Sequence, residues 1–543
     1  MSTTATDTTQ FRECDMDDIQ GLLTRIQDID LPEKDKDLLR DLIHSHAYLI
    51  HKLGSKNMSI KRLRQLIFGA TTETKKNVDK QANKARGTET QDKPDQKKPK
   101  DPPPGHGRLS ADAYTGAEVN KIPHQSLKPG DPCPVKNCLG RVYEKSPIIL
   151  LRIKGQAPFV ATRNEQARLR CNLCNKIFKA DLPEGMGDQK YGESVIAWLA
   201  FLRYCNGLPM KRIEEMQRQA GVPFPDSTQW ALLEKGDQLI RPIFRELIRL
   251  AGQGSLLYND DTPMKLLDFM KELKEREANG EPPPERTGTR TTGIVSELAD
   301  RWRIVLYFTG WKHAGENLIE VLKNRDAGLD PPLQMCDGLS HNVPGELETI
   351  LCNCLAHARR QFADCVFGFP DEVQHVIDEL ALVYKHEAET KGERMTPTQR
   401  LKHHKKYSTP VMKRLKDWMD KQIAEKLVEP NSELGKAINY ALKRWDRLTR
   451  FLSRTGAPLD NNLTERMLKR AIIHRKNSIF YKTEKGAAVG DLYMSLISTA
   501  KLTGINPCRY LEALLQHQGE IAGDPGSWLP WNYQETLKNL PTN

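Results

Sequence analysis

The central part of the chain alternates short apolar runs with segments of helical periodicity. The runs at residues 256–260 and 333–337 have the length and composition of buried strands, and each ends in an aspartate. Residues 294–298 and 302–308 are predicted as a further pair of strands, and 313–324 as a helix that leads into the strand at 333. This order of strands, helix and strand predicts a mixed α/β sheet with acids at strand ends.

Residues 192–251 are predicted to form helices. The pattern gives a second helix at 210–220, a turn at 221–225 and a third helix with Asp226 or Ser227 as its N-cap. A helix-turn-helix of this kind can enter the major groove of DNA, although helices that only pack together give the same pattern.

The long segment after Asp337 carries helical patterns and little strand character, which predicts an all-helical insertion. The predicted helices cover residues 346–366, 371–389, 398–427 and 433–454. The third contains a basic cluster that suits either phosphate contact or a solvated helix face: Arg400, Lys402, His403, His404, Lys405 and Lys406. Amphipathic helices at 493–502 and 507–515 are predicted to pack their apolar stripes in the core.

The amino-terminal part has a different composition. Apolar positions at spacings of three and four between residues 35 and 68 indicate a heptad seam, which fits a coiled coil or an amphipathic helix packed within its own subunit. Between residues 71 and 108, lysines, arginines and prolines replace aliphatic residues. This segment is predicted as a flexible linker.

Four cysteines after the linker have the spacing of a zinc site. Cys133 and Cys138 form one pair, Cys171 and Cys174 form the second, and short β-like runs lie between the pairs. Four thiolates in two pairs suit tetrahedral Zn²⁺. Small zinc ribbons need the metal in order to fold, because they cannot bury enough core without it. Ordinary free cysteines are the alternative, because four residues rather than two separate the first pair.

Composition narrows the classes of function. The 543 residues carry a formal net charge of +11 and a pI near 8.9, which fits a nucleic-acid partner. No stretch approaches twenty apolar residues and residues 1–15 are polar, so neither a membrane span nor a secretory signal is expected. Eleven cysteines in such a chain indicate a reducing compartment, with metal or core roles rather than disulfides.

Three acids stand out because of their surroundings. Asp260 and Asp337 close apolar runs, and Glu465 begins a predicted helix. The cations of that helix are Lys469, Arg470, His474, Arg475 and Lys476. Hard cations such as Mg²⁺ take carboxylate oxygens together with substrate phosphate, so the three acids suit a site that cuts phosphodiesters. Each acid taken singly is more simply a turn residue or a helix cap.

Motifs around these acids run in one order along most of the chain. They are Asp260-Asp261-Thr262-Pro263, Leu333-Gln334-Met335-Cys336-Asp337-Gly338, Cys354-Leu355-Ala356-His357-Ala358-Arg359-Arg360-Gln361-Phe362, Asp460-Asn461-Asn462, Glu465-Arg466, Arg475-Lys476-Asn477-Ser478-Ile479-Phe480 and Leu529-Pro530-Trp531-Asn532. In this set the chain resembles a transposase of the bacterial insertion-sequence-66 family, within the class of DDE transposases. The resemblance implies a ribonuclease-H-like α/β catalytic core in which Asp260, Asp337 and Glu465 are catalytic and bind two Mg²⁺ or Mn²⁺ ions.

Asp261 stands where the family has Glu, so the first acid is Asp260 or its neighbour. Neighbouring side chains on a strand point to opposite faces, so only one is expected to bind metal, and Asp260 is preferred because Thr262-Pro263 fixes the register. The resemblance also implies a zinc-finger-like domain, with one structural Zn²⁺ on Cys133, Cys138, Cys171 and Cys174. The residues expected to contact DNA are Arg359, Arg360, Arg466, Lys469, Arg470, Arg475, Lys476 and Asn477.

These features predict a multidomain α+β protein. The expected parts are a helical, coiled-coil-like segment (1–70), a basic linker (71–125), a zinc ribbon (126–185), a helix-turn-helix-like domain (186–251), the two parts of the core with the terminal helices (252–344 and 458–543) and the all-helical insertion (345–457).

The predicted function is that of a DNA transposase, which binds element ends, cleaves phosphodiester bonds by metal-assisted hydrolysis and joins the 3′-hydroxyl to target DNA. The alternatives are a domesticated or inactive DNA-binding relative and a nuclease without strand-transfer activity. Expected partners are double-stranded DNA, at least one further copy of the chain and accessory proteins encoded by the same element, with no membrane. The expected location is the bacterial cytoplasm, at the nucleoid.

Overall fold

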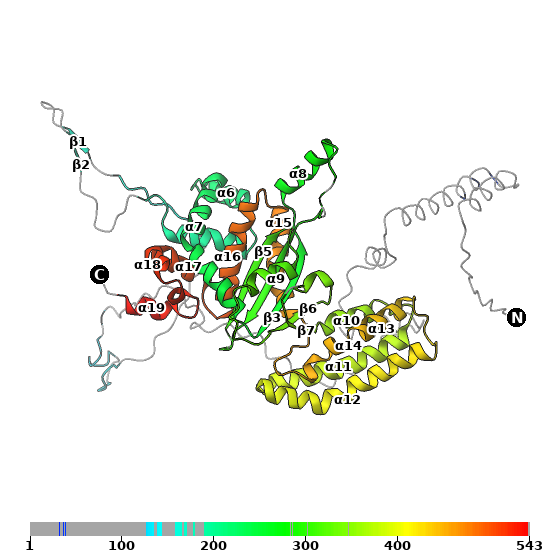
Figure 1. Cartoon of the computed structure of the whole chain (residues 1–543). Helices are drawn as coiled ribbons and strands as arrows, with labels where there is room; N and C mark the ends of the chain where they lie inside the picture. Colours follow the sequence, from blue (N-terminus) through cyan, green and yellow to red (C-terminus); the bar gives the residue numbers. More distant parts are fainter. Residues whose placement is uncertain are drawn as a thin grey trace. The chain divides into compact units, whose positions relative to one another are not determined.

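A computed structural model covers the whole chain (Figure 1). It describes residues 32, 36, 39, 126, 128–134, 138–143, 158–165, 168–170, 177–179 and 189–540, except 283, 285, 301 and 346. The predicted heptad helix lies outside the described residues, apart from residues 36 and 39, and so do the linker at 71–108 and the second cysteine pair.

The chain divides into two compact units. We call Cys354–Leu459 the helical unit, and Thr90–Asn353 with Asp460–Asn543 the sheet unit. The sheet unit is thus assembled from two segments of the chain that are far apart in sequence.

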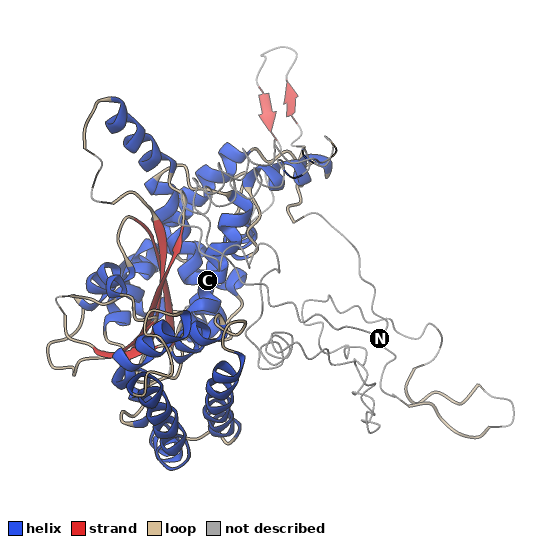
Figure 2. Cartoon of the chain, turned by 90° about the vertical axis from the view of Figure 1, so that its right-hand side faces the viewer, coloured by secondary structure: helices blue, strands red, loops and turns tan. Residues whose placement is uncertain are grey.

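A five-stranded mixed sheet forms the centre of the sheet unit (Figure 2). Its spatial order is β5-β4-β3-β6-β7, with antiparallel pairing of β5, β4 and β3 and parallel pairing of β3, β6 and β7. The strands are β3 (Leu256–Pro263), β4 (Arg290–Glu297), β5 (Arg303–Gly310), β6 (Leu333–Cys336) and β7 (Ile350–Asn353). This mixed α+β arrangement is compatible with a ribonuclease-H-like core and confirms the strands predicted near 256, 294, 302 and 333.

Strand β7 corrects one expectation, because its residues were predicted as part of a helix beginning at 346. The short run Leu351-Cys352 pairs with β6 at the edge of the sheet, where Gln334 lies opposite Leu351 and Met335 opposite Cys352. Only Asn353 and Cys354 separate this run from the helical periodicity that begins at Leu355, and this closeness concealed the strand.

The outer strand β5 is covered by a helix whose side chains replace a neighbouring strand. Alternate backbone N–H groups of β5 donate to side chains four residues apart on α16 (Glu484–Leu502). The pairs are Val305 to Thr499 Oγ1 (3.0 Å), Tyr307 to Ser495 Oγ (2.9 Å) and Thr309 to Asp491 Oδ2 (2.6 Å). Two strand residues span about 6.7 Å and four helical residues about 6 Å, so the two rows match. The edge is thereby satisfied without another strand.

Further helices complete this unit, some against the sheet and others against helices. They are α5 (Glu193–Ala200), η2 (Phe201–Cys205), α6 (Met210–Gln219), α7 (Asp226–Gly252), α8 (Leu267–Ala278), α9 (Ala314–Leu322), η3 (Ser340–Asn342), α15 (Asn462–Ser478), α17 (Pro507–Gln516), α18 (Gln518–Gly523), η5 (Gly526–Trp528) and α19 (Tyr533–Asn539). Helix α7 begins after Pro225 without a side-chain cap, so neither Asp226 nor Ser227 caps it as predicted. Within the described residues, no helix has both the length and the apolar composition needed to cross a bilayer.

The helical unit consists of helices that follow one another with short connections. They are α10 (Leu355–Ala363), α11 (Pro370–Gly392), α12 (Pro397–Ala424), α13 (Glu433–Lys443), α14 (Trp445–Leu448) and η4 (Arg450–Leu452). Helices α11 and α12 pack along each other over most of their length (Figure 1).

A buried carboxylate, Glu387, joins α11 to α12. Its Oε2 lies 2.8 Å from Arg400 Nε and 2.9 Å from His404 Nε2, and Lys391 pairs with its Oε1 at 3.0 Å. His404 Nδ1 in turn lies 2.9 Å from the hydroxyl of Ser408. Burial by itself raises the pKa of Glu387, but the hydrogen bond with His404 and the positive charges of Arg400 and Lys391 lower this pKa to about 2.

This network corrects the expectation that the basic cluster of α12 forms one surface patch. Residues 400, 404 and 408 are four apart, so Arg400 and His404 lie on the face toward α11, and His404 is fully buried. Of the six residues of the cluster, the exposed ones are Lys402, Lys405 and Lys406.

We expect Glu387→Gln to destabilise the helical unit by about 3 kcal/mol at pH 7, because the depressed pKa of Glu387 reports stabilisation of its ionised form. Ionised Glu387 contributes its full stabilisation above the ordinary pKa of Glu, and this stabilisation is lost as the pH falls toward about 2. The difference in the free energy of unfolding between wild type and variant should therefore shrink by about half between pH 6 and pH 3. Hydrogen exchange of peptides from α11 and α12 measures this difference in stability at each pH.

The matched control is Glu379→Gln, which removes the ion pair between Glu379 of α11 and the exposed Arg414 of α12 (2.8 Å). Its cost should stay below about 1 kcal/mol. Equal effects of the two substitutions, or a Glu387→Gln effect independent of pH, would contradict the account.

Candidate active site

The first two acids are placed by parallel strand pairing. Tyr258 of β3 lies opposite Met335 of β6, and Asp260 and Asp337 each follow two residues later. Neighbouring strands are about 4.8 Å apart, so Asp337, directly after the end of β6, lies beside Asp260 of β3. Gly338, with a φ of 87°, turns the chain directly after Asp337.

The third acid is brought to the same strand by α15. Asp260 is opposite Gly293 in the β3–β4 register, and a side chain at Gly293 would meet Leu468 of α15 at 2.9 Å. Glycine at this position therefore lets α15 approach the sheet. Asn461, before the first turn of α15, donates to the carbonyl of Asn259 at 3.2 Å, and Glu465 lies in that first turn.

Electrostatics show that the three carboxylates act on one another. Burial first, and then the negative charges of Asp337, Glu465 and Asp261, raise the pKa of Asp260 to about 7, against a hydrogen bond from the backbone N–H of Asp261 that lowers it. The atoms that could bind a metal ion here are carboxylate oxygens, which suit Mg²⁺ or Mn²⁺. A divalent cation would offset the repulsion that the raised pKa reports, so the residues present fit such an ion.

Asp261 faces the other side of the sheet. Its carboxylate accepts from the hydroxyl of Thr292 (2.6 Å) and from the backbone N–H of Ala314 (3.0 Å), at the beginning of α9. It thus anchors a helix, and the alternation of side chains along β3 separates it from the other acids. Ligand atoms of Asp261, His313 and His341 lie within 4.8 Å of one another, but Arg290 contacts Nε2 of His313 and its guanidinium charge opposes a cation there.

A buried amide network holds the loop that carries the second acid. Asn259 donates to the carbonyl of Asn342 (2.7 Å), and Gln334 donates both to Asn259 Oδ1 (2.9 Å) and to the same carbonyl (2.8 Å). Asn342 then donates to Asp337 Oδ1 (2.7 Å), which also accepts from the backbone N–H of Leu339 (3.0 Å). Sequence reasoning missed this network, although polar residues inside two buried apolar runs are a usable signal.

The residues predicted to contact DNA fall into three groups. Arg466, Lys469 and Lys476 are exposed on α15. Arg470 and Arg475 are partly used within the fold, since Arg470 donates to Cys205 Sγ (3.1 Å) and Arg475 donates to Thr262 Oγ1 (3.2 Å) and to the carbonyl of Pro263. The remaining ones are half-buried: Asn477 on α15, and Arg359 and Arg360 on α10 of the helical unit.

His474 corrects the expectation that every basic residue of α15 seeks phosphate. It is fully buried between the rings of Tyr204 and Tyr481, whose centroids lie 6.0 and 4.6 Å from its own. Burial, helped by the charge of Arg203, lowers the pKa of His474 to about 3, so the imidazole is neutral and belongs to the core.

The first cysteine pair lies in a small hairpin. Cys133 N–H donates to the carbonyl of Gly140 (2.8 Å), and Pro132 bridges to Arg141. A backbone hydrogen bond from Gly140 and a hydrogen bond with the thiol of Cys133 lower the pKa of Cys138, which favours the thiolate that a metal needs. Cys171 and Cys174 lie outside the described residues, between the paired strands β1 (Arg168–Arg170) and β2 (Ile177–Lys179).

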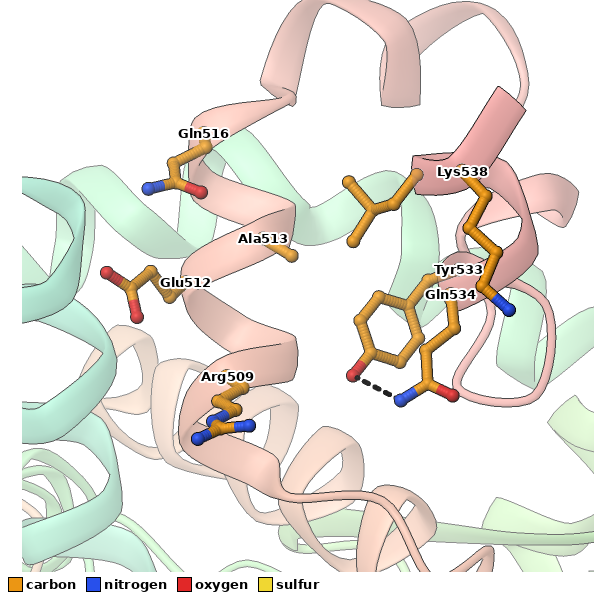
Figure 3. A pocket seen from close by; sticks show the side chains of 8 residues that line it. Arg509, Glu512, Ala513, Gln516, Tyr533, Gln534 and Lys538 are labelled. Carbon is orange, nitrogen blue, oxygen red and sulfur yellow. Dashed lines mark hydrogen bonds between the residues drawn. The ribbon is translucent and has the colours of Figure 1, made fainter. Parts of the chain in front are cut away.

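A pocket of about 510 Å³ lies between α17 and α19 (Figure 3). Its lining includes Arg509, Glu512, Tyr533, Gln534 and Lys538. None of the three acids lines it, so it has no evident part in their chemistry.

Comparison with known proteins gives a family match and several relatives. A family model described as "Transposase IS66 family" matches residues 189–489, more than half of the chain. The uncharacterized protein y4jD of Sinorhizobium fredii (strain NBRC 101917 / NGR234) is 33% identical over 390 residues, which cover 68% of this chain and 72% of that protein. The uncharacterized protein y4qI of the same strain is 25% identical over 367 residues, which cover 63% of this chain and 62% of that protein.

We expect Mn²⁺ to raise the Tm of the wild-type protein by about 4 °C, and Asp337→Asn to abolish most of this shift. Because a proton on Asp260 competes with the ion and the pKa of Asp260 is about 7, the shift should grow between pH 6 and pH 8. Thermal unfolding monitored by fluorescence measures it without any activity.

Asp268→Asn is the control, since Asp268 is an exposed carboxylate in the first turn of α8. It should retain the full Mn²⁺ shift. Retention of that shift by Asp337→Asn would show that the ion binds elsewhere.

Proposed function

Because this chain belongs to the IS66 family of transposases, we propose that it is a DDE-type enzyme that cleaves the ends of a DNA element and joins the freed 3′-hydroxyls to target DNA. The observation that carries the proposal is the convergence of Asp260, Asp337 and Glu465 beside the central strand β3, where β6 ends. Three carboxylates held by different elements make an oxygen-rich site beside which a DNA phosphate can lie.

Asp260, Asp337 and Glu465 would hold the Mg²⁺ or Mn²⁺ ions. Bound there, a metal pair activates the attacking oxygen and stabilises the leaving oxygen of a phosphodiester. The chain itself positions the acids: the Asn342 amide and the Leu339 N–H orient the carboxylate of Asp337. The attacking group is a water in cleavage and the 3′-hydroxyl in joining, so no serine or tyrosine nucleophile is needed.

The DNA backbone would lie along the exposed face of α15. Arg466, Lys469 and Lys476 are on this face, and Glu465 is the one acid of the helix. Cations on a helix that begins at the acids can hold the strand to be cut, because phosphate contacts fix the register of a duplex. Arg359 and Arg360 are proposed as further phosphate contacts, on the matching motif of α10.

The remaining predictions belong to the same proposal. A zinc ribbon on the four cysteines and the helices α6 and α7 would recognise element ends, and the chain would act as at least a dimer at the nucleoid, with accessory proteins of the element. The two other functions considered, a DNA holder without activity and a nuclease without joining activity, are outcomes of the first experiment.

Purified protein with Mg²⁺ and duplexes that carry the element ends should yield both nicked and joined products on a denaturing gel. Asp337→Asn should reduce both by at least about 100-fold, because loss of one metal ligand removes several kcal/mol of transition-state stabilisation. The control Asp330→Asn changes an exposed aspartate before β6 and should leave both products unchanged.

Full activity of Asp337→Asn would refute the assignment of the acids. Nicked product without joined product would identify a nuclease, and binding of end DNA without either product would identify a DNA holder.

Lys469→Ala and Lys476→Ala should each weaken binding of duplex DNA, and each should reduce the dependence of log affinity on log salt by about one unit, as expected for loss of one phosphate contact. Fluorescence anisotropy at several salt concentrations measures this slope. Lys271→Ala is the control, since Lys271 on α8 pairs with Glu275 at 3.4 Å. An unchanged slope in both α15 variants would remove that helix from the interface.

A further inference from the structure

Helix α15 ends in a strained turn centred on Ile479. This residue has φ 68° and ψ −45°, and the N–H of Phe480 donates to the carbonyl of Ser478 at 2.8 Å. The combination defines a γ-turn with positive φ, which is a rare and strained conformation. A β-branched side chain makes it more costly, because its Cβ substituents crowd the backbone when φ is positive.

Both apolar side chains of the turn remain exposed to solvent in part. Ile479 is 58% exposed and Phe480 is 37% exposed. Glycine would form the same turn with little strain. Backbone strain that is held in place at an exposed turn is typical of sites that act on another molecule.

The turn is fixed on both sides. Before it, Arg475 donates to Thr262 Oγ1 and to the carbonyl of Pro263, at the end of the strand that carries Asp260. After it, the buried Tyr481 exchanges backbone hydrogen bonds with Lys265 (2.9 Å) and Leu267 (3.0 Å). Ile479 and Phe480 are therefore displayed on a rigid support that is continuous with the first acid.

The surroundings of the turn are cationic. Arg466, Lys469, Ile473 and Lys476 follow one another at spacings of three, four and three residues, so they share the exposed face of α15 that leads to the turn. This surface matches the two parts of DNA. The basic face of α15 suits the phosphates, and the apolar tip at its end suits the bases.

We propose that Ile479 and Phe480 form a wedge that inserts between base pairs of the element end. The inference rests on the proposed function and adds a deformed DNA as its substrate. Glu465 and Ile479 are 14 residues apart on one helix, a distance of about 21 Å, which places the wedge about six base pairs from the phosphate to be cut. Apolar side chains that enter base steps unstack them and kink the duplex, which exposes the strand to the acids.

The experiment uses the full-length protein and end duplexes that carry 2-aminopurine at successive positions from the cleavage site. With the wild-type protein, fluorescence should rise at a position about five to seven base pairs from that site, because unstacked 2-aminopurine is brighter. Ile479→Gly removes the side chain and relieves the strain, so Tm should rise by about 1–3 °C while the fluorescence signal falls at least about threefold. Phe480→Ala should lower the signal without the gain in Tm.

Arg394→Gly and Lys426→Gly are matched controls, since these exposed residues also have positive φ, 52° and 57°. Each should raise Tm and leave the DNA signal unchanged. If wild type cleaves the DNA but no position brightens, or if Ile479→Gly retains the full signal, the wedge is refuted and the proposed function stands. If wild type neither binds nor cleaves end DNA, both are refuted.

Discussion

Burial of the Asp260 carboxylate beside two further acids, Asp337 and Glu465, is the constraint around which the sheet unit is built. The parallel register of β3 and β6 sets Asp260 beside Asp337, and glycine at 293 lets α15 bring Glu465 to the same edge. Burial, with a further contribution from the negative charges of the neighbouring acids, raises the pKa of Asp260 to about 7. Three acids held close together cost the folded protein free energy when no cation is bound. A divalent cation between them would offset this cost, as expected of a metal-dependent active site.

Two devices keep this crowded edge in place. On one side, the row Asp491, Ser495 and Thr499 on α16 satisfies the outer strand and removes the need for a further strand. On the other side, the amides of Asn259 and Asn342 connect β3 to the loop that carries the second acid. Both are buried networks of hydrogen bonds between groups of the chain, so they hold the local geometry. The acids can then be positioned despite their repulsion.

Sequence predicted those parts of the fold that periodicity and strand-end acids reveal. The strands that carry Asp260 and Asp337 were found because their apolar runs are short and each ends in a charge. Strand β7 was missed because its run passes directly into the helix that follows. The burial of His474 and His404 could not be predicted, since both lie in strings of basic residues and only the packing of neighbouring elements decides which way each faces. The strained turn at Ile479 is likewise visible only in backbone angles.

The central claim is that residues far apart in sequence surround one metal site. Fe²⁺ substituted for Mg²⁺, with ascorbate and peroxide, generates hydroxyl radicals that cut the backbone close to the bound ion, and mass spectrometry locates the cuts. The account predicts cuts in three separate segments, around Asp260, Asp337 and Glu465, all suppressed by excess Mg²⁺. Cuts confined to one of these segments, or located only at the cysteines, would contradict it.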